Sequence, residues 1–530
     1  MKSQLFVTRR SLLKTLGAGA LAQIGCGIAA PYISRAADRP GIPFGVQSGD
    51  VSADGAMIWA RTDIAARMHV EVSTTESFNS ILKGVSVDAL PESDFTAKVL
   101  MDGLPGDQDI FYRIRFQNHN EPALFSAPAA GRFRTPPADK KPINFVWSGD
   151  TAGQGWGIDE SRGGMRCYET MRRNRPDFFI HSGDTVYADG AVLPEQKMPD
   201  GGVWKNITIE EKLKAAETLA EFRAAFKYNL MDRNVLAFNA EVPGFYQWDD
   251  HEVTDNWWPG QSLTSADHRT KKYTQANMMT LAARASRAFH EFLPVRPSAN
   301  EPGRVYRRLS YGPSLDLFFI DMRSYRAPNG DNRQMAYGPD AYFLGPEQLA
   351  WLKRELKASR ATWKIIASDM PIGLYVADDW RKNSGSEAVA QNDHGVPLGR
   401  ELEIAEILSF MKREKIFNTV WLTADVHYTA AHYYNPDKAA FQDFEPFWEF
   451  VSGPLHAGTF GPNQLDGTFG PELRFIKAPS KEQGVNLPPS YDMQFFGHVA
   501  IDGNTEVMTV TLKDWNNVSL WAVQIEPKRA

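Results

Sequence analysis

Four apolar segments of this sequence each lead into an aspartate, and these acidic residues have the type and placement to do chemistry. They are Asp150, Asp184, Asp250 and Asp425. A histidine or a tyrosine lies within three residues of each of the last three. Ligands of α/β sheets bind beyond the carboxyl ends of the strands, so side chains from distant parts of the chain can converge there. The pattern predicts one site built from all four segments.

Carboxylates gathered in one place repel each other and lose hydration, so such a cluster needs cations. Oxygen and imidazole ligands together suit hard or borderline ions such as iron, zinc, manganese or calcium. Two ions bridged by one carboxylate would bind a phosphate group and supply a metal-bound hydroxide for in-line attack on phosphorus. One strand-end aspartate is more often a helix cap or a turn residue, but four with neighbouring His or Tyr favour a metal site.

Three short motifs resemble those of known metallophosphoesterases. Residues 183–187 read Gly-Asp-Thr-Val-Tyr, which matches the GDxxY motif of purple acid phosphatases and the calcineurin-like superfamily. With Trp-Asp-Asp-His-Glu-Val at 248–253 and Thr-Ala-Asp-Val-His at 423–427, the chain resembles the alkaline phosphatase D (PhoD-like) family over nearly its whole length. This implies a phosphoric ester hydrolase with two or more metal ions, iron with calcium or another divalent ion. The implied fold is an α/β (α+β) metallophosphoesterase-like four-layer sandwich with an N-terminal fibronectin/Ig-like β-sandwich.

The resemblance also implies roles for single residues. Asp184 would be the carboxylate that bridges two metals, and Tyr187 would be a phenolate ligand that favours ferric iron. His251 would face the phosphate, as an acid for the leaving group or as a contact to the transition state. The other implied metal ligands are Asp250, Asn256 as a nearby alternative to it, Asp425 and His427.

Asp150 departs from the family pattern. The alkaline phosphatase D pattern usually has a cysteine at the end of the first strand, whereas this chain has Gly149-Asp150, closer to purple acid phosphatases. We predict that Asp150 is a metal ligand. A carboxylate in place of a thiolate hardens the site, so the choice between iron with calcium and two like transition metals stays open.

Arg323 follows a further predicted strand and is the second predicted catalytic residue. Its guanidinium could hold two phosphate oxygens at once. A structural contact between Arg323 and Asp321 is an equally good interpretation.

The N-terminus has the pattern of an export signal. Residues 8–14, Thr-Arg-Arg-Ser-Leu-Leu-Lys, form a twin-arginine signature, and a glycine-diluted apolar stretch and a small-residue cleavage site follow. This predicts a signal peptide over 1–37, export by the twin-arginine machinery to the periplasm or the exterior, and no stable membrane span. Only Cys167 remains after such cleavage, which excludes an intramolecular disulfide, and its place in an apparent helix favours a buried inert thiol.

Length and pattern predict two folded domains. The chain has 530 residues, more than one hydrophobic core usually serves. Its net charge of −6 gives no positive potential that would attract nucleic acid. Short alternating apolar runs predict a β-sandwich over 38–136, and alternating strands and helices predict the catalytic domain over 137–530. Its predicted strands are 143–148, 177–182, 245–248, 315–320, 363–368 and 417–423, with late antiparallel strands at 495–501 and 507–512. Its predicted helices are 163–174, 210–228, 272–292, 346–358 and 398–414.

Two alternative functions stay open at this level. The first is a secreted binding or adhesion protein that uses the β-sandwich. The second is a phospholipase D-like phosphodiesterase with a pocket rich in aromatic residues. The aromatic candidates are Trp156, Trp257, Trp258, Tyr375 and Trp380.

Overall fold

The structure is a computed structural model that describes residues 39–263, 272–379 and 381–529. The predicted signal peptide, 1–37, lies outside these residues. The chain from Pro40 to Ala530 forms one compact unit. No helix among the described residues combines the length and the apolar character that crossing a membrane requires.

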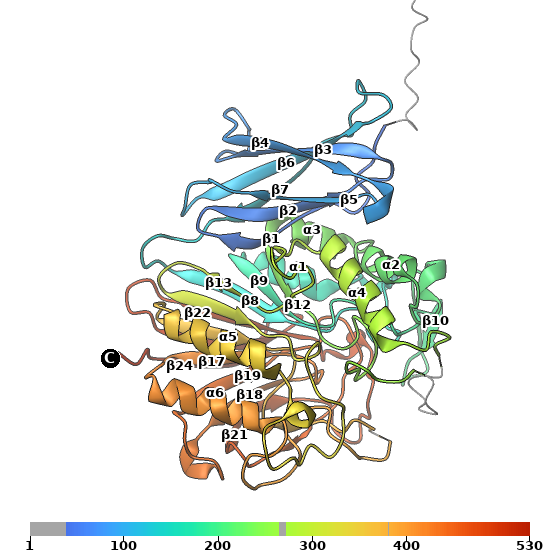
Figure 1. Cartoon of the computed structure of the whole chain (residues 1–530). Helices are drawn as coiled ribbons and strands as arrows, with labels where there is room; N and C mark the ends of the chain where they lie inside the picture. Colours follow the sequence, from blue (N-terminus) through green and yellow to red (C-terminus); the bar gives the residue numbers. More distant parts are fainter. Residues whose placement is uncertain (1–38, 264–271, 380, 530) are drawn as a thin grey trace, which may run out of the picture. The chain divides into compact units, whose positions relative to one another are not determined.

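Two large β-sheets form the body of this unit (Figure 1). Among the described residues, the first sheet has the order β24-β23-β22-β8-β9-β12-β1-β2-β5 and the second the order β13-β14-β15-β17-β19-β18-β21. The strands of the first are β1 (Val46–Ser52), β2 (Gly55–Arg61), β5 (Thr96–Met101), β8 (Ile143–Ser148), β9 (Phe178–Ser182), β12 (Gly244–Gln247), β22 (Phe495–Ile501), β23 (Met508–Asp514) and β24 (Ser519–Ile525). Those of the second are β13 (Arg307–Ser310), β14 (Leu315–Phe319), β15 (Trp363–Ala367), β17 (Thr419–Thr423), β18 (Thr429–Tyr434), β19 (Phe447–Val451) and β21 (Pro471–Lys477).

Alternation of side chains along the strands explains why the two sheets pack face to face. In β8, Phe145 and Trp147 point into the core between the sheets, whereas Val146 points to the helices outside. In β17, Leu422 points into the core between the sheets and Trp421 points to the helices outside. Strands that are buried on both faces are apolar throughout, which is why these segments read as continuous hydrophobic runs.

Helices cover the outer face of each sheet, which completes four layers. The first group packs on the nine-stranded sheet and the second on the other sheet, where α5 and α6 lie side by side (Figure 1). The first group is α1 (Arg166–Arg173), α2 (Leu219–Asn229), α3 (Arg233–Glu241) and α4 (Met278–Phe292). The second is α5 (Gly345–Ala358) and α6 (Glu401–Arg413). Two short hairpins, β10 (Glu195–Lys197) with β11 (Val203–Lys205) and β16 (Leu374–Tyr375) with β20 (Gln464–Leu465), lie outside the large sheets.

The N-terminal part is a β-sandwich that shares a sheet with the rest. Its second layer is β4 (Lys83–Ala89), β3 (Ala66–Ser73), β6 (Asp109–Asn118) and β7 (Ala129–Arg134), in that order, packed over β1, β2 and β5 (Figure 1). The first layer joins the nine-stranded sheet where Gly49 of β1 pairs with Gly244 of β12. A β-carbon on Gly49 would lie 2.4 Å from the Gly244 carbonyl oxygen, so the junction requires glycine.

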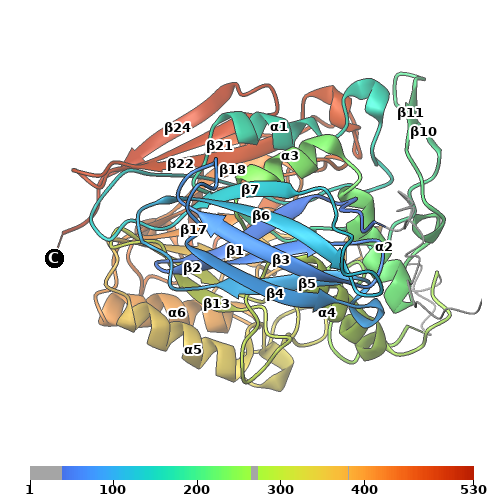
Figure 2. The same ribbon diagram turned by 90° about the horizontal axis from the view of Figure 1, so that it is seen from above.

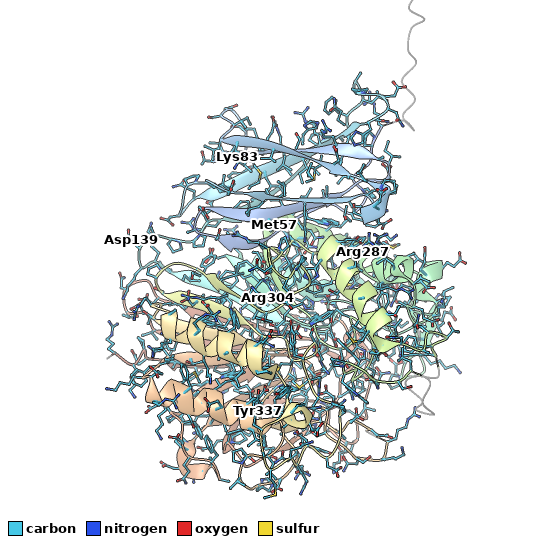
Figure 3. All side chains as sticks on the ribbon, viewed as in Figure 1. Met57, Lys83, Asp139, Arg287, Arg304 and Tyr337 are labelled. Atoms are coloured by element: carbon cyan, nitrogen blue, oxygen red, sulfur yellow. The ribbon has the colours of Figure 1, made fainter. Side chains whose placement is uncertain are left out.

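Further contacts tie the sandwich to α4. Arg287 of α4, labelled in Figure 3, donates to the Glu92 carbonyl at 2.6 Å. The predicted boundary after residue 136 falls in the connection between β7 and β8. The division into domains 38–136 and 137–530 stays a prediction, because the shared sheet runs across it.

The predicted strands of the large domain all exist, and most bounds agree within two residues. The predicted helix over 210–228 begins only at Leu219, after a short 3-10 turn at Glu210–Lys212. Helix α3 was not predicted, although Asp232 caps it by accepting from the backbone nitrogens of Asn234 and Val235. Cys167 is fully buried in α1, and burial raises the pKa of its thiol, as predicted for an inert cysteine.

Candidate metal centre

Four loops bring aspartates together at the carboxyl ends of parallel strands. Strands β8, β9 and β12 are parallel neighbours in the first sheet, and β17 faces them from the second. In each case an aspartate stands two residues beyond the last residue of the strand: Asp150, Asp184, Asp249 and Asp425. The convergence predicted from the sequence is therefore a property of the fold.

Glycines allow these loops to pack closely. A β-carbon on Gly149 would lie 2.7 Å from a side chain of the loop after β17, and one on Gly183 would lie 2.5 Å from the β-carbon of Asp249. The aspartates that follow these glycines, Asp150 and Asp184, have left-handed backbones with φ of 66° and 52°. Each such residue costs about 1 kcal/mol of backbone strain, a feature that concentrates at functional sites.

Three overlapping groups of possible metal ligands result. Within each group, one ligand atom from every residue lies within 4.8 Å of the others. The groups are Asp150, Asp184 and His427; Asp184, Asp250 and His251; and Asp249, Asp250 and Asp425. Because Asp184 and Asp250 each belong to two groups, the three form one continuous site.

Burial makes this concentration of carboxylates unfavourable without cations. Asp150 and Asp184 are each 1% exposed, and neither carboxylate oxygen of Asp150 has a hydrogen-bond partner among the described residues. Burial, and then the Asp249 carboxylate, raise the pKa of Asp150 well above its ordinary value. Burial has the same effect on the pKa of Asp184 and on that of Asp425. Buried carboxylate oxygens without donors are a donor set that fits hard cations.

His427 is held in the protonation state that a metal ligand needs. Its Nδ1 hydrogen-bonds to the Gly458 carbonyl, which directs Nε2 into the site. Nε2 lies 2.7 Å from the Tyr187 hydroxyl and 3.8 Å from Asp150 Oδ1. Burial lowers the pKa of His427 to about 4, so the ring is neutral at pH 7. The sequence-predicted residues Tyr187 and His427 therefore meet beside Asp150.

His251 lies against Tyr187 and is oriented by a carboxylate that the sequence analysis missed. The two rings stack with centroids 4.3 Å apart. His251 Nδ1 bonds to Asp189 Oδ1 at 2.8 Å, while Nε2 lies 4.0 Å from Asp250 Oδ1. Burial lowers the pKa of His251, but Asp189 and the other nearby carboxylates outweigh burial and raise it well above 6.5. Asp189 is in turn held by Lys272, whose Nζ is 3.0 Å from Oδ2.

Comparison with known families identifies the family of this chain. Residues 145–512 match the sequence model of the family described as PhoD-like phosphatase, and residues 27–137 match that of the PhoD-like phosphatase N-terminal domain. The chain belongs to the PhoD-like phosphatase family. It is a metal-dependent phosphoesterase, and the motifs that suggested this family are those that converge on the site.

Individual relatives agree with the family assignment. Alkaline phosphatase D of Bacillus subtilis (strain 168) is 26% identical over 485 residues, which cover 85% of this chain and 77% of the relative. A solved structure titled "Structure of PhoD" superposes with a TM-score of 0.65 at 19% identity and covers 94% of each chain. Purple acid phosphatase PPD1 from yellow lupin (Lupinus luteus) seeds gives 0.54 at 12% identity, covering 92% of this chain and 74% of its own. The last two likenesses establish a metallophosphoesterase-like fold.

The Arg323 side chain lies against carboxylates of the candidate centre. Its side chain is fully buried, with Nε 2.5 Å from Asp249 Oδ1 and 3.3 Å from Asp369 Oδ2. Nη1 pairs with Glu387, and Nη2 lies 3.8 Å from Asp425 Oδ1. The alternative contact with Asp321 is also present, through the Arg323 backbone nitrogen at 3.0 Å. The guanidinium faces carboxylates, and a phosphate clamp by Arg323 stays a prediction.

Asn256 is tied to the same centre through its backbone. Its nitrogen donates to Asp250 Oδ2 at 2.6 Å, and its side-chain Nδ2 donates to the Asp378 carbonyl at 3.2 Å. It thus holds Asp250 in place, and a role as an alternative ligand stays a prediction.

Two of the five aromatic residues expected to line a pocket are buried instead, while Trp258 and Tyr375 are partly exposed, and the pocket itself stays a prediction. Trp156 and Trp257 are each 1% exposed and pack edge-to-face on Trp204 and Trp248, so they belong to the core. Trp380 lies outside the described residues. The sequence could not reveal this because aromatic residues serve cores and pockets equally well.

Glu252 is a second functional carboxylate that the sequence analysis missed. It accepts from the backbone nitrogens of Asp184 at 3.2 Å, Thr185 at 2.5 Å and Asp249 at 2.8 Å. One buried side chain therefore joins the two loops that carry three of the site's aspartates. The available signal was its place in the motif at 248–253, directly after His251.

Proposed function

We propose that the chain hydrolyses phosphate monoesters, diesters or both outside the cytoplasm, as an alkaline phosphatase D-like enzyme. The observation that supports this most directly is the sharing of Asp184 and Asp250 among three adjacent groups of ligands. A shared carboxylate lets neighbouring cations approach closely enough to engage one phosphate group together.

We assign Asp150, Asp184, Tyr187 and His427 to one cation. Asp250 and Asp425, with Asn256 as an alternative, would serve the neighbouring positions. Phenolate and carboxylate oxygens suit ferric iron, and groups of carboxylates suit calcium or another divalent ion. When bound, such ions polarise phosphate oxygens and lower the pKa of a water molecule.

We assign His251 to the leaving group and Arg323 to the balance of charge among the carboxylates. His251, held by Asp189, is placed to give a proton to the leaving oxygen, because its Nε2 points toward the carboxylates that would hold the cations. Arg323 balances the carboxylates of Asp249, Asp369 and Glu387, which allows the ligand loops to stay closed.

The twin-arginine signature at 8–14 supports export to the periplasm or the exterior. A phospholipase D-like phosphodiesterase is the remaining alternative substrate class, and burial of Trp156 and Trp257 removes part of its support. The other alternative, a binding protein without catalysis, is set aside by membership of a phosphatase family.

Chelation is expected to abolish turnover. Removing the metals from protein purified after native export should lower hydrolysis of p-nitrophenyl phosphate, of the bis-ester, or of both by at least about a hundredfold, because metal activation of water and of phosphate is lost. Re-addition of iron with calcium, compared with two like transition metals and read beside elemental analysis, assigns the metals. Undiminished activity of fully stripped protein on both esters would rule out the proposal.

Asp189→Asn is expected to slow the hydrolysis of esters with poor leaving groups most. The change removes the negative charge that orients His251 and keeps it protonated, so kcat for phenyl phosphate should fall by about tenfold to a hundredfold. p-Nitrophenolate leaves without a proton, so kcat for p-nitrophenyl phosphate should fall far less. Equal losses on the two esters would show that Asp189 acts only on structure.

A further inference from the structure

A hollow apart from the metal centre lies on the flank where the sandwich meets α1 and α3. It has a volume of about 500 Å³ and is lined by Arg132, Arg172, Arg173, Arg175 and Glu241, here called the arginine groove. Figure 2 shows β7, α3 and α1, which carry or adjoin these residues, next to one another. We propose that the arginine groove is a second, non-catalytic site that binds a linear anion with two or more phosphate groups.

The groove carries more positive charge than its carboxylates can balance. Glu241 pairs with Arg132 at 3.3 Å and with Arg172 at 2.7 Å. Glu169 pairs with Arg172 at 2.7 Å and with Arg173 at 2.8 Å. Among the described residues, three guanidinium groups therefore share two carboxylates, and the fourth, that of Arg175, pairs with neither. The surplus of two positive charges balances about one phosphate group, and a hollow of about 500 Å³ has room for a second one joined to it.

Arg175 is the side chain that most clearly lacks a structural role. No hydrogen bond or ion pair of its guanidinium occurs among the described residues, and the residue is exposed. Its backbone, however, is fixed: the nitrogen donates to the Arg172 carbonyl at 3.0 Å, and its own carbonyl accepts from Asn144 Nδ2 at 3.2 Å. The backbone is also left-handed, with φ of 49°, which costs free energy for a residue with a side chain. A strained, anchored backbone thus presents an unpaired guanidinium to the groove.

The end of a helix explains only part of this cluster. Arg172 and Arg173 lie in the last turn of α1, where cations balance the helix dipole without any ligand. Arg132 comes from β7 of the sandwich, and Arg175 lies beyond the end of the helix. Two separate segments, β7 and the end of α1 with the residues that follow it, therefore deliver guanidinium groups to one hollow. One guanidinium group can bind two oxygens of the same phosphate, which favours phosphate over a simple halide.

The groove lies at the opposite end of the strands from the metal centre. An adjoining hollow of about 160 Å³, which shares Arg132, Arg172, Arg175 and Glu241, is also lined by Asp177 and Pro243. These two residues directly precede β9 and β12, whereas Asp184 follows the far end of β9. Asp177 and Asp184 thus lie beyond opposite ends of the five-residue strand β9, which spans roughly 16 Å at about 3.3 Å per residue. An anion in the groove is therefore not the phosphate undergoing hydrolysis, and it would retain the enzyme on phosphate-rich material.

Hydrogen–deuterium exchange of the metal-loaded protein with tripolyphosphate tests the proposal. Peptides covering residues 170–177 should gain protection, and calorimetry should show affinity about tenfold weaker in Arg175→Gln, which breaks no ion pair. Arg360→Gln, which removes an exposed charge elsewhere, is the matched control and should bind like the unaltered protein. Turnover of p-nitrophenyl phosphate should be unchanged in both variants.

Three results would overturn the proposal. Protection confined to peptides of the metal centre would place the anion there alone. Equal weakening by Arg360→Gln would show attraction to overall charge and not to the groove. Equal protection by inorganic monophosphate at the same phosphate concentration would refute the requirement for two phosphate groups. Loss of catalysis on chelation, with protection at 170–177 retained, would separate this site from the proposed function.

Discussion

Asp184→Asn is expected to lower kcat for phosphate-ester hydrolysis by about a thousandfold or more, equivalent to about 4 kcal/mol. Asp184 contributes to two of the three groups of ligands, so its negative charge supports two cation positions at once. Asparagine keeps the shape and can still accept the hydrogen bond that the His251 backbone nitrogen makes to Oδ1 at 3.1 Å. The loop is therefore retained while charge and metal affinity are lost.

Metal content and activity should fall together in this variant. Elemental analysis should show that Asp184→Asn binds less of both metals than the unaltered protein. Asp316→Asn is the matched control, since Asp316 of strand β14 is also a buried aspartate, 2% exposed, but pairs with Arg308 away from the centre. It should keep its metals and its kcat even where it loses stability. An Asp184→Asn protein that retains a tenth of the normal kcat with full metal content would contradict the assignment.

The catalytic part of the fold could be predicted because strand ends and chemistry coincide. An aspartate two residues beyond a buried strand signals both the end of the strand and the edge of the sheet where ligands bind. Asp150, Asp184 and Asp425 each follow this rule, so the sequence located most of the centre. The face-to-face packing of the two sheets, which brings Asp425 of one near Asp150 of the other, is not encoded in local patterns.

Supporting residues were harder to find because their partners are distant in the sequence. Asp189 acts through His251, 62 residues away, and Arg323 meets Glu387, 64 residues away. Neither pairing leaves a periodic signal. The same holds for the sheet that runs from the large domain into the sandwich, because the junction rests on the single pair Gly49 and Gly244. The turn residues near 136 predicted a domain boundary, and the pairing of β1 with β12 joins strands from the two sides of it.

Arg323 shows how this centre stays folded despite its carboxylates. The guanidinium is fully buried and within ion-pair distance of Asp249, Asp369 and Glu387. Neither oxygen of the Asp369 carboxylate has a hydrogen bond among the described residues, and burial raises its pKa well above its ordinary value. Glu387 also pairs with Arg326 at 2.8 Å. Removing Arg323 would still leave the buried carboxylates of Asp249 and Asp369 unbalanced, which costs far more than losing an exposed ion pair.

Arg323→Met is therefore expected to lower the free energy of unfolding by about 3–5 kcal/mol, measured by urea denaturation of metal-stripped protein. Metal-loaded protein should lose less, because cations at the neighbouring carboxylates take over part of the balancing charge. Arg323→Lys should lower the free energy of unfolding by less than Arg323→Met does, since an ammonium keeps the charge but not the planar set of donors. Arg287→Met is the control: Arg287 is 53% exposed and pairs with Glu291, so its loss should be about 1 kcal/mol or less. Equal losses in Arg323→Met and Arg287→Met would show that the buried carboxylates are protonated and need no cation.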